Sequence, residues 1–189
     1  QLSFKEIYEK KLLNRKIYLI DVPNKRPKFY VKRCFEVAFD LLRKGITNKI
    51  INGPVNKTKT LNKKFLGVTE YIANSFKKKR FAMLIYNPEL SVCPVTTHLP
   101  LRLVKNHISK KILREKIQII DNFYKKFLKI KPKIAVTGLN PHCESILKFN
   151  EDEKIIYPVI NSLKKNINVK GPFPSDTIFL KKNREKFDV

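Results

Sequence analysis

Apolar residues recur every three or four positions in several stretches of the chain, which is the spacing of one face of an α-helix. Residues 31–42 have this pattern, and Gly45 can end the helix that they predict. Residues 112–127 have it as well, and Ser109 is a good N-cap for their helix. Two further helices are predicted at residues 69–76 and 151–165.

Short apolar runs lie between these helices and predict β-strands. The run at residues 81–86 is apolar enough to indicate a buried strand, and Asn87-Pro88 makes a turn after it. The predicted strands are residues 49–52, 81–86, 90–96, 133–137 and 167–169, and residues 187–189 resemble the start of another. Strands that alternate with helices predict an α/β layered fold with a largely parallel sheet.

The composition is that of a globular protein with an excess of positive charge. Hydrophobic residues make up 42% of the 189 residues, and no stretch approaches the roughly 20 apolar residues that span a bilayer. The formal charge is +25, from 41 Lys and Arg against 16 Asp and Glu. Most of it is lysine spread along the whole chain, whereas arginine is the usual residue for bidentate phosphate contacts. We therefore expect neither a nucleic-acid partner nor a membrane, and a basic RNA-binding protein is kept as a competing hypothesis.

Cysteine usage indicates a reducing compartment. The three cysteines are an odd number, and no CxxC motif occurs. Free thiols in the cytoplasm are the simplest interpretation.

Two of the three histidines lie just past predicted strands. Ligands bind beyond the carboxyl ends of strands in open α/β sheets, so His98 and His142 could face one pocket. Neutral imidazole is the commonest protein metal ligand, which makes a shared metal site one hypothesis. The alternative is that both are polar loop residues that cap neighbouring helices. His107 lies before the Ser109 helix, and we interpret it as a surface or capping histidine.

Two loops could contact a charged substrate. Residues 53–57 follow a predicted strand and could bring backbone and the Lys57 ammonium near a phosphate. Residues 171–177 form a proline-rich loop that carries the Asp176 carboxylate. We take Lys57 and Asp176 as the candidate catalytic residues. The competing interpretations are a simple Gly-Pro turn in the first loop and a helix cap in the second.

Five sequence blocks together resemble a known family. They are Asn-Gly-Pro-Val-Asn-Lys (52–57), Gly-Val-Thr-Glu (67–70), Thr-Thr-His-Leu-Pro-Leu (96–101), Gly-Leu-Asn-Pro-His (138–142) and Gly-Pro-Phe-Pro-Ser-Asp-Thr (171–177). In this order they look like the signature blocks of the 4-hydroxythreonine-4-phosphate dehydrogenases. The resemblance is collinear from Val31 to Val189.

The resemblance implies a fold and an activity. The fold would be the layered α/β/α arrangement of isocitrate and isopropylmalate dehydrogenases, incomplete at both ends, with residues 1–189 as a single incomplete catalytic region. The activity would be the NAD-dependent oxidation, followed by decarboxylation, of 4-phosphohydroxy-L-threonine in vitamin B6 biosynthesis. A divalent cation (Zn²⁺, Mg²⁺ or Co²⁺) would act as a Lewis acid. The enzyme would be a cytoplasmic homodimer with a phosphorylated small molecule as its substrate.

The family's functional residues carry over position by position. His98 and His142 match the first two metal ligands, and the third is a histidine in a block beyond Val189. Thr69 matches a substrate-binding threonine. The substrate-binding histidine beside it in the family is Val68 here, and valine cannot donate a hydrogen bond.

This departure keeps several hypotheses open. The chain could belong to the dehydrogenase named above, in which case the 189-residue piece alone is expected to be inactive because a metal ligand is missing. It could instead belong to a related dehydrogenase for another phosphorylated four-carbon hydroxy acid. The third hypothesis is an inactive truncated remnant that serves in binding or dimerisation.

Overall fold

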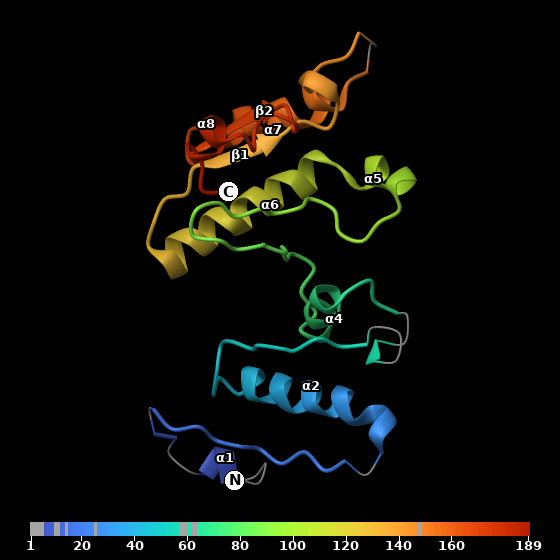
Figure 1. The fold of residues 1–189 in the computed structure, drawn as a ribbon, viewed down its shortest axis with the longest axis vertical. Coiled ribbons are helices and arrows are strands. Elements are labelled where there is room, and N and C mark those ends of the chain that lie inside the picture. Colours follow the sequence, from blue (N-terminus) through green and yellow to red (C-terminus); the bar gives the residue numbers. More distant parts are fainter. Residues whose placement is uncertain are drawn as a thin grey trace. The chain divides into compact units, whose positions relative to one another are not determined.

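The computed structural model describes residues 6–9, 12–13, 15–24, 26–56, 60–61, 64–146 and 149–189. Contacts within the chain divide it into two compact units, Gln1–Lys77 and Lys78–Val189. Figure 1 shows the course of the chain through the helices and strands of each unit. The expectation that residues 1–189 act as one catalytic region stays a prediction.

The first unit is helical. Its described helices are α1 (Glu6–Glu9), α2 (Pro27–Arg43) and α4 (Val68–Ser75). The proline at the first position of α2 suits a helix start, and Gly45 follows its end with a φ of +72°. Aromatic rings join α2 to α4, since Phe39 lies 5.6 Å from Tyr71 and 5.3 Å from Phe76, measured between ring centroids. This confirms two of the predicted helices.

The second unit combines helices with a parallel pair of strands. Its described elements are α5 (Leu101–His107), α6 (Lys110–Phe123), the π-helical turn η1 (Tyr124–Leu128), β1 (Ile134–Thr137), the 3₁₀ turn η2 (Pro141–Cys143), the π-helical turn η3 (Asp152–Ile156), α7 (Tyr157–Leu163), β2 (Val169–Phe173) and α8 (Lys181–Arg184). As predicted, the Ser109 hydroxyl caps α6 by accepting a hydrogen bond from the Ile112 amide at 3.3 Å. The predicted helix at 151–165 corresponds to η3 and α7 together.

The strands β1 and β2 are parallel, with Ile134 opposite Val169. The end of the chain lies on the other side of β1. There the Val189 carbonyl accepts a hydrogen bond from Ala135 at 2.7 Å, and its amide donates to Lys133 at 3.3 Å, which is the pattern of a parallel pair. The start of a strand predicted at residues 187–189 is therefore present as a hydrogen-bonded segment.

A cluster of buried aliphatic side chains from α6, β1, η3, α7 and β2 forms the core of this unit. It includes Leu113, Ile117, Ile120, Ile134, Val136, Ile156, Val159, Ile160, Leu163 and Val169. The mixture of helices with parallel strands confirms the α/β class. The isocitrate dehydrogenase-like arrangement of layers stays a prediction.

Three of the predicted strands do not form as expected. Residues 49–52 have no strand pairing in the described part of the chain, and Ile51 is 99% exposed. Residues 81–86 and 90–96 contribute one antiparallel bridge, between Ile85 and Val92, and Ile85 is 58% exposed rather than buried. An apolar run makes a strand only when a neighbouring backbone pairs with it, and periodicity does not report that neighbour. None of the described helices combines the length and the apolar character needed to cross a membrane.

Candidate functional site

The loop that follows β1 carries His142 and has an unusual backbone. Gly138 begins the loop and donates its amide hydrogen to the Phe173 carbonyl at the end of β2, at 2.8 Å. His142 and Cys143 have φ angles of 58° and 64°, in the left-handed region. Each such residue costs about 1–2 kcal/mol when it is not glycine, so the surrounding contacts must hold this conformation. The result is an exposed His142 side chain just past the end of a strand.

The buried carboxylate of Asp152 holds the first half of this loop. One of its oxygens accepts the Leu139 amide at 2.8 Å. The other accepts the Asn140 amide at 3.0 Å and the Asn140 side-chain amide at 2.9 Å. Asp152 has an exposed fraction of 0%. The sequence alone indicates this residue only as an acidic side chain near the start of a helix.

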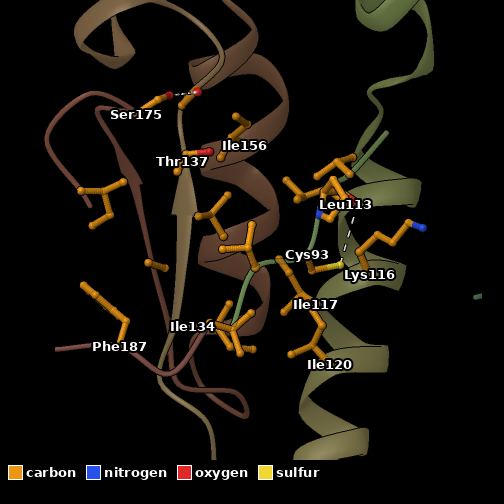
Figure 2. Close-up of a pocket in the computed structure, with 18 of the residues that line it drawn as sticks. Cys93, Leu113, Lys116, Ile117, Ile120, Ile134, Thr137, Ile156, Ser175 and Phe187 are labelled. Carbon is orange, nitrogen blue, oxygen red and sulfur yellow. Dashed lines mark hydrogen bonds between the residues drawn. The ribbon is translucent and has the colours of Figure 1, made fainter. Parts of the chain in front are cut away.

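The loop of Asp176 is tied to the loop of His142. The Ser175 hydroxyl donates to the Gly138 carbonyl at 3.1 Å (Figure 2). Burial raises the pKa of the Cys143 thiol, the charge of Asp152 raises it further, and Asp176 adds a smaller contribution of the same sign. Asp176 itself is exposed. The structure therefore brings together two of the predicted blocks, 138–142 and 171–177.

There is no room for a side chain at Gly138. A Cβ atom there would lie 2.5 Å from the Cys143 sulfur and 3.0 Å from a carboxylate oxygen of Asp152. Glycine at this position thus permits the close packing of the loop against the buried carboxylate.

His98 lies in an irregular segment between Val92 and α5 rather than directly past a strand. Its φ angle is 56°, and its side chain is exposed. Thr96, two residues earlier, lines a cavity of about 370 Å³ that Gly138 also lines. Most of the other lining side chains are apolar. The apolar ones include Cys93, Ile117, Ile120 and Ile134, and the hydroxyl-bearing Thr137 and Ser175 also line the cavity (Figure 2). Segments leading to both histidines thus share one cavity wall, and a common site for the two rings stays a prediction.

The remaining predicted site residues are placed as follows. Thr69 lies in the first turn of α4, in the first unit, and is half-buried. Lys57 lies outside the described residues. The ring of His107 is exposed at the end of α5, where its Nδ1 is 2.9 Å from the Leu103 carbonyl oxygen. This confirms the interpretation of His107 as a surface histidine. The three cysteines are free, as expected.

Two of the histidines that are expected to bind a metal ion lie among the described residues. Among them, no group of three or more His, Cys, Asp or Glu side chains lies together. Catalytic zinc sites generally use three protein ligands. Two exposed imidazoles suit a borderline metal ion as donors, but a further ligand is needed to complete such a site.

These features define an α/β protein in which loops at the ends of adjacent parallel strands carry a histidine and a carboxylate. The pattern of the family described as "Pyridoxal phosphate biosynthetic protein PdxA" matches residues 5–189, so the chain belongs to this family.

Individual relatives agree with this assignment. A 4-hydroxythreonine-4-phosphate dehydrogenase of a Hydrogenobaculum species is 38% identical over 136 residues, covering 70% of this chain and 43% of the relative. A D-threonate 4-phosphate dehydrogenase of Salmonella typhimurium is 34% identical, covering 83% of this chain and 49% of the relative. A crystal structure of the Klebsiella pneumoniae 4-hydroxythreonine-4-phosphate dehydrogenase superposes with a TM-score of 0.73 at 29% identity, covering 85% and 50% of the two chains. The chain spans about half the length of the curated relatives it matches.

Proposed function

We propose that the protein containing this chain is an NAD-dependent dehydrogenase of vitamin B6 biosynthesis that oxidises 4-phosphohydroxy-L-threonine, whose product then loses carbon dioxide. The observation that carries the proposal is the match of the family pattern to residues 5–189, and the hydrogen bond from Ser175 to Gly138 joins the two loops of His142 and Asp176 that the proposal uses. Membership of the family and the names of its relatives support the same activity.

The residues have distinct roles in this proposal. His98 and His142 would hold a divalent cation through their ring nitrogens, and the third ligand would come from outside the described residues. The chemistry that such a cation supplies is Lewis-acid polarisation of the substrate oxygen. Hydride acceptance is the chemistry that NAD supplies.

The other candidate residues act on the substrate directly. Thr69 binds the substrate through its hydroxyl. The exposed Asp176 carboxylate takes part in proton transfer, and Lys57 provides a positive charge for the phosphate. We also propose that the enzyme is a homodimer, which sedimentation of the purified protein tests.

The decisive experiment follows NADH absorbance with the full-length protein, with and without a chelator. We expect turnover of 4-phosphohydroxy-L-threonine that is lost with the chelator and restored by added Zn²⁺, Mg²⁺ or Co²⁺. The 189-residue piece should be inactive under the same conditions. Robust turnover by the piece would refute the requirement for a third ligand. No turnover by the full-length protein on any phosphorylated four-carbon substrate would favour the inactive remnant.

A second candidate function is the oxidation of D-threonate 4-phosphate. Two observations favour it. One relative has that name at 34% identity, and Val68 occupies the position beside Thr69. D-threonate 4-phosphate is a phosphorylated four-carbon hydroxy acid that has a hydroxyl group in place of the amino group of 4-phosphohydroxy-L-threonine. In this proposal, the apolar residue at position 68 marks a preference for a different substrate.

Substitution at position 68 separates the two functions. We expect Val68→His to raise kcat/KM for 4-phosphohydroxy-L-threonine. The gain corresponds to a transition state that is stabilised by about 1–3 kcal/mol, because a buried polar group of the substrate regains a hydrogen-bond partner. Val68→Leu is the matched control, since it changes shape without adding a donor. If the wild-type protein already prefers 4-phosphohydroxy-L-threonine and Val68→His does not improve it, this account of position 68 is wrong.

A further inference from the structure

Asp152 is a buried carboxylate that binds the loop of His142. It has an exposed fraction of 0% and lies at the start of the helical stretch that runs from η3 into α7. A carboxylate is expensive to bury unless hydrogen bonds replace its water. Here three N–H groups do so, at 2.8, 3.0 and 2.9 Å, and all three belong to Leu139 and Asn140.

These hydrogen bonds use both oxygens of the Asp152 carboxylate and hold the loop in place. The backbone amides of Leu139 and Asn140 bind separate oxygens of the carboxylate, so this part of the loop cannot rotate without breaking one of them. The Asn140 side chain also donates to a Glu151 oxygen at 3.0 Å. Two residues further along the loop is His142, which holds a left-handed backbone conformation.

The helix end that bears Asp152 is itself fixed. The Asn150 side-chain oxygen accepts the Asp152 amide at 2.9 Å and the Glu153 amide at 3.4 Å, which is the pattern of a helix cap. Asn150 is also buried, with an exposed fraction of 1%. The carboxylate is therefore a rigid reference point for the loop rather than a mobile side chain.

We infer that Asp152 is a positioning residue for His142: its carboxylate binds Leu139 and Asn140 and thereby sets where the imidazole is presented. This inference rests on the proposed function for the claim that the imidazole binds a metal ion. The positioning itself does not depend on that claim, because the bonds are present without any ion.

The test uses the histidine ring signals of the full-length protein in NMR spectra, with the His142 signal identified by its loss in His142→Gln. In Asp152→Asn an NH₂ group replaces one acceptor oxygen and faces an N–H donor of the loop. We expect the His142 signal to shift or broaden, while the signals of His98 and His107 keep their positions. Asp121→Asn is the matched control, because Asp121 is a carboxylate on α6 that is 5% exposed and pairs with Lys125 at 2.6 Å. It should leave the His142 signal unchanged.

A second variant covers the case in which Asp152→Asn does not fold. Asn140→Asp has nearly the same shape, but it places a third carboxylate against those of Asp152 and Glu151 and leaves the buried helix start intact. It should move the His142 signal in the same selective way. A folded Asp152→Asn protein with an unchanged His142 signal overturns the inference. If Asp152→Asn is unfolded, an unchanged signal in folded Asn140→Asp overturns it instead.

Titration with Zn²⁺ separates this inference from the proposed function. The wild-type His142 signal should respond to Zn²⁺. Asp152→Asn should need about 10-fold more of the ion, the lower end of the loss seen when a group bound directly to a ligand is removed, because Asp152 acts on His142 only through the loop. If the wild-type signal ignores Zn²⁺ but still moves in Asp152→Asn, the positioning role stands and the metal role of His142 fails. If Asp152→Asn moves the His142 signal but binds Zn²⁺ as tightly as the wild type, the positioning role stands and its effect on metal binding is refuted.

Discussion

His142 and His98 both have exposed rings and left-handed backbones, but the segments that carry them are built differently. The His142 loop begins at a parallel strand and binds a buried carboxylate through three hydrogen bonds. The His98 segment is irregular, and its nearest regular pairing is the single bridge between Ile85 and Val92. One histidine is thus positioned by the core of the second unit, whereas the other follows a segment with little regular structure.

The contrast between the two segments indicates that a site can combine a firmly held loop, that of His142, with a more adaptable segment, that of His98. Both left-handed residues need support from their surroundings, and the two segments differ in how much hydrogen bonding supplies it. Around His142 those surroundings are the helix start at Asp152 and the hydroxyl of Ser175. For His98 we expect a larger adjustment when a ligand binds, because loops with few regular hydrogen bonds open most readily.

The largest effect is expected from removing either imidazole. In the full-length protein, His142→Ala and His98→Ala should each lower the affinity for Zn²⁺ and the turnover by at least about 100-fold, because loss of an outer partner alone costs 10- to 100-fold. His107→Ala is the control and should leave both values close to those of the wild type. Calorimetric titration with Zn²⁺ measures the affinity. Should His98→Ala bind Zn²⁺ normally while His142→Ala does not, the two loops do not share a metal site.

The next effect concerns the packing of the His142 loop. Gly138→Ala places a Cβ atom 2.5 Å from the Cys143 sulfur, so we expect the free energy of unfolding to fall by about 1–3 kcal/mol. Urea denaturation measures this change. Gly53→Ala is the matched control, since a Cβ atom there meets nothing within 4 Å.

A double variant tests the cause of the Gly138→Ala effect. Adding Cys143→Ala removes the sulfur that the new methyl group would meet, so part of the lost stability should return. If the double variant is no more stable than Gly138→Ala alone, the sulfur is not the source of the clash.

The sequence indicates the regular parts of this molecule better than the irregular ones. The helices α2, α4 and α6 follow from apolar spacing and from a capping serine, because these signals are local. The predicted strands at 49–52 and 81–86 fail for the opposite reason. Pairing depends on a backbone segment far away in sequence, and an apolar run does not reveal whether one is present.

The same limit applies to the candidate site. Motif blocks point to the loops of His142 and Asp176, and the structure places those loops in contact through Ser175 and Gly138. Asp152 is missed because its role depends on bonds to residues 12 and 13 positions earlier in the chain. The left-handed φ of His142 is also not indicated, because only a few per cent of residues other than glycine adopt a positive φ.

The smallest effect concerns the anchor of the segment that leads to His98. The buried Tyr124 hydroxyl donates to the Ser91 hydroxyl at 2.9 Å, and the Ser91 amide donates to the Asp188 carbonyl at 2.8 Å. Tyr124→Phe removes the first of these bonds, so we expect a loss of about 1 kcal/mol in the free energy of unfolding at neutral pH. Tyr157→Phe, at an exposed position on α7, is the control.

The pH dependence of the same variant gives a further test. Burial raises the pKa of Tyr124 above its ordinary value of 10.0, and the nearby charge of Asp188 also raises it, while the hydrogen bond with Ser91 lowers it. As the pH rises through 10.0, the unfolded phenol loses its proton before the folded one does. The unfolded state then binds fewer protons, so the free energy of unfolding falls with rising pH. Tyr124→Phe should show a shallower fall in denaturation curves measured over this alkaline range. If the free energy of unfolding of Tyr124→Phe falls with pH as steeply as that of the wild type, the burial of a neutral Tyr124 hydroxyl does not contribute to stability.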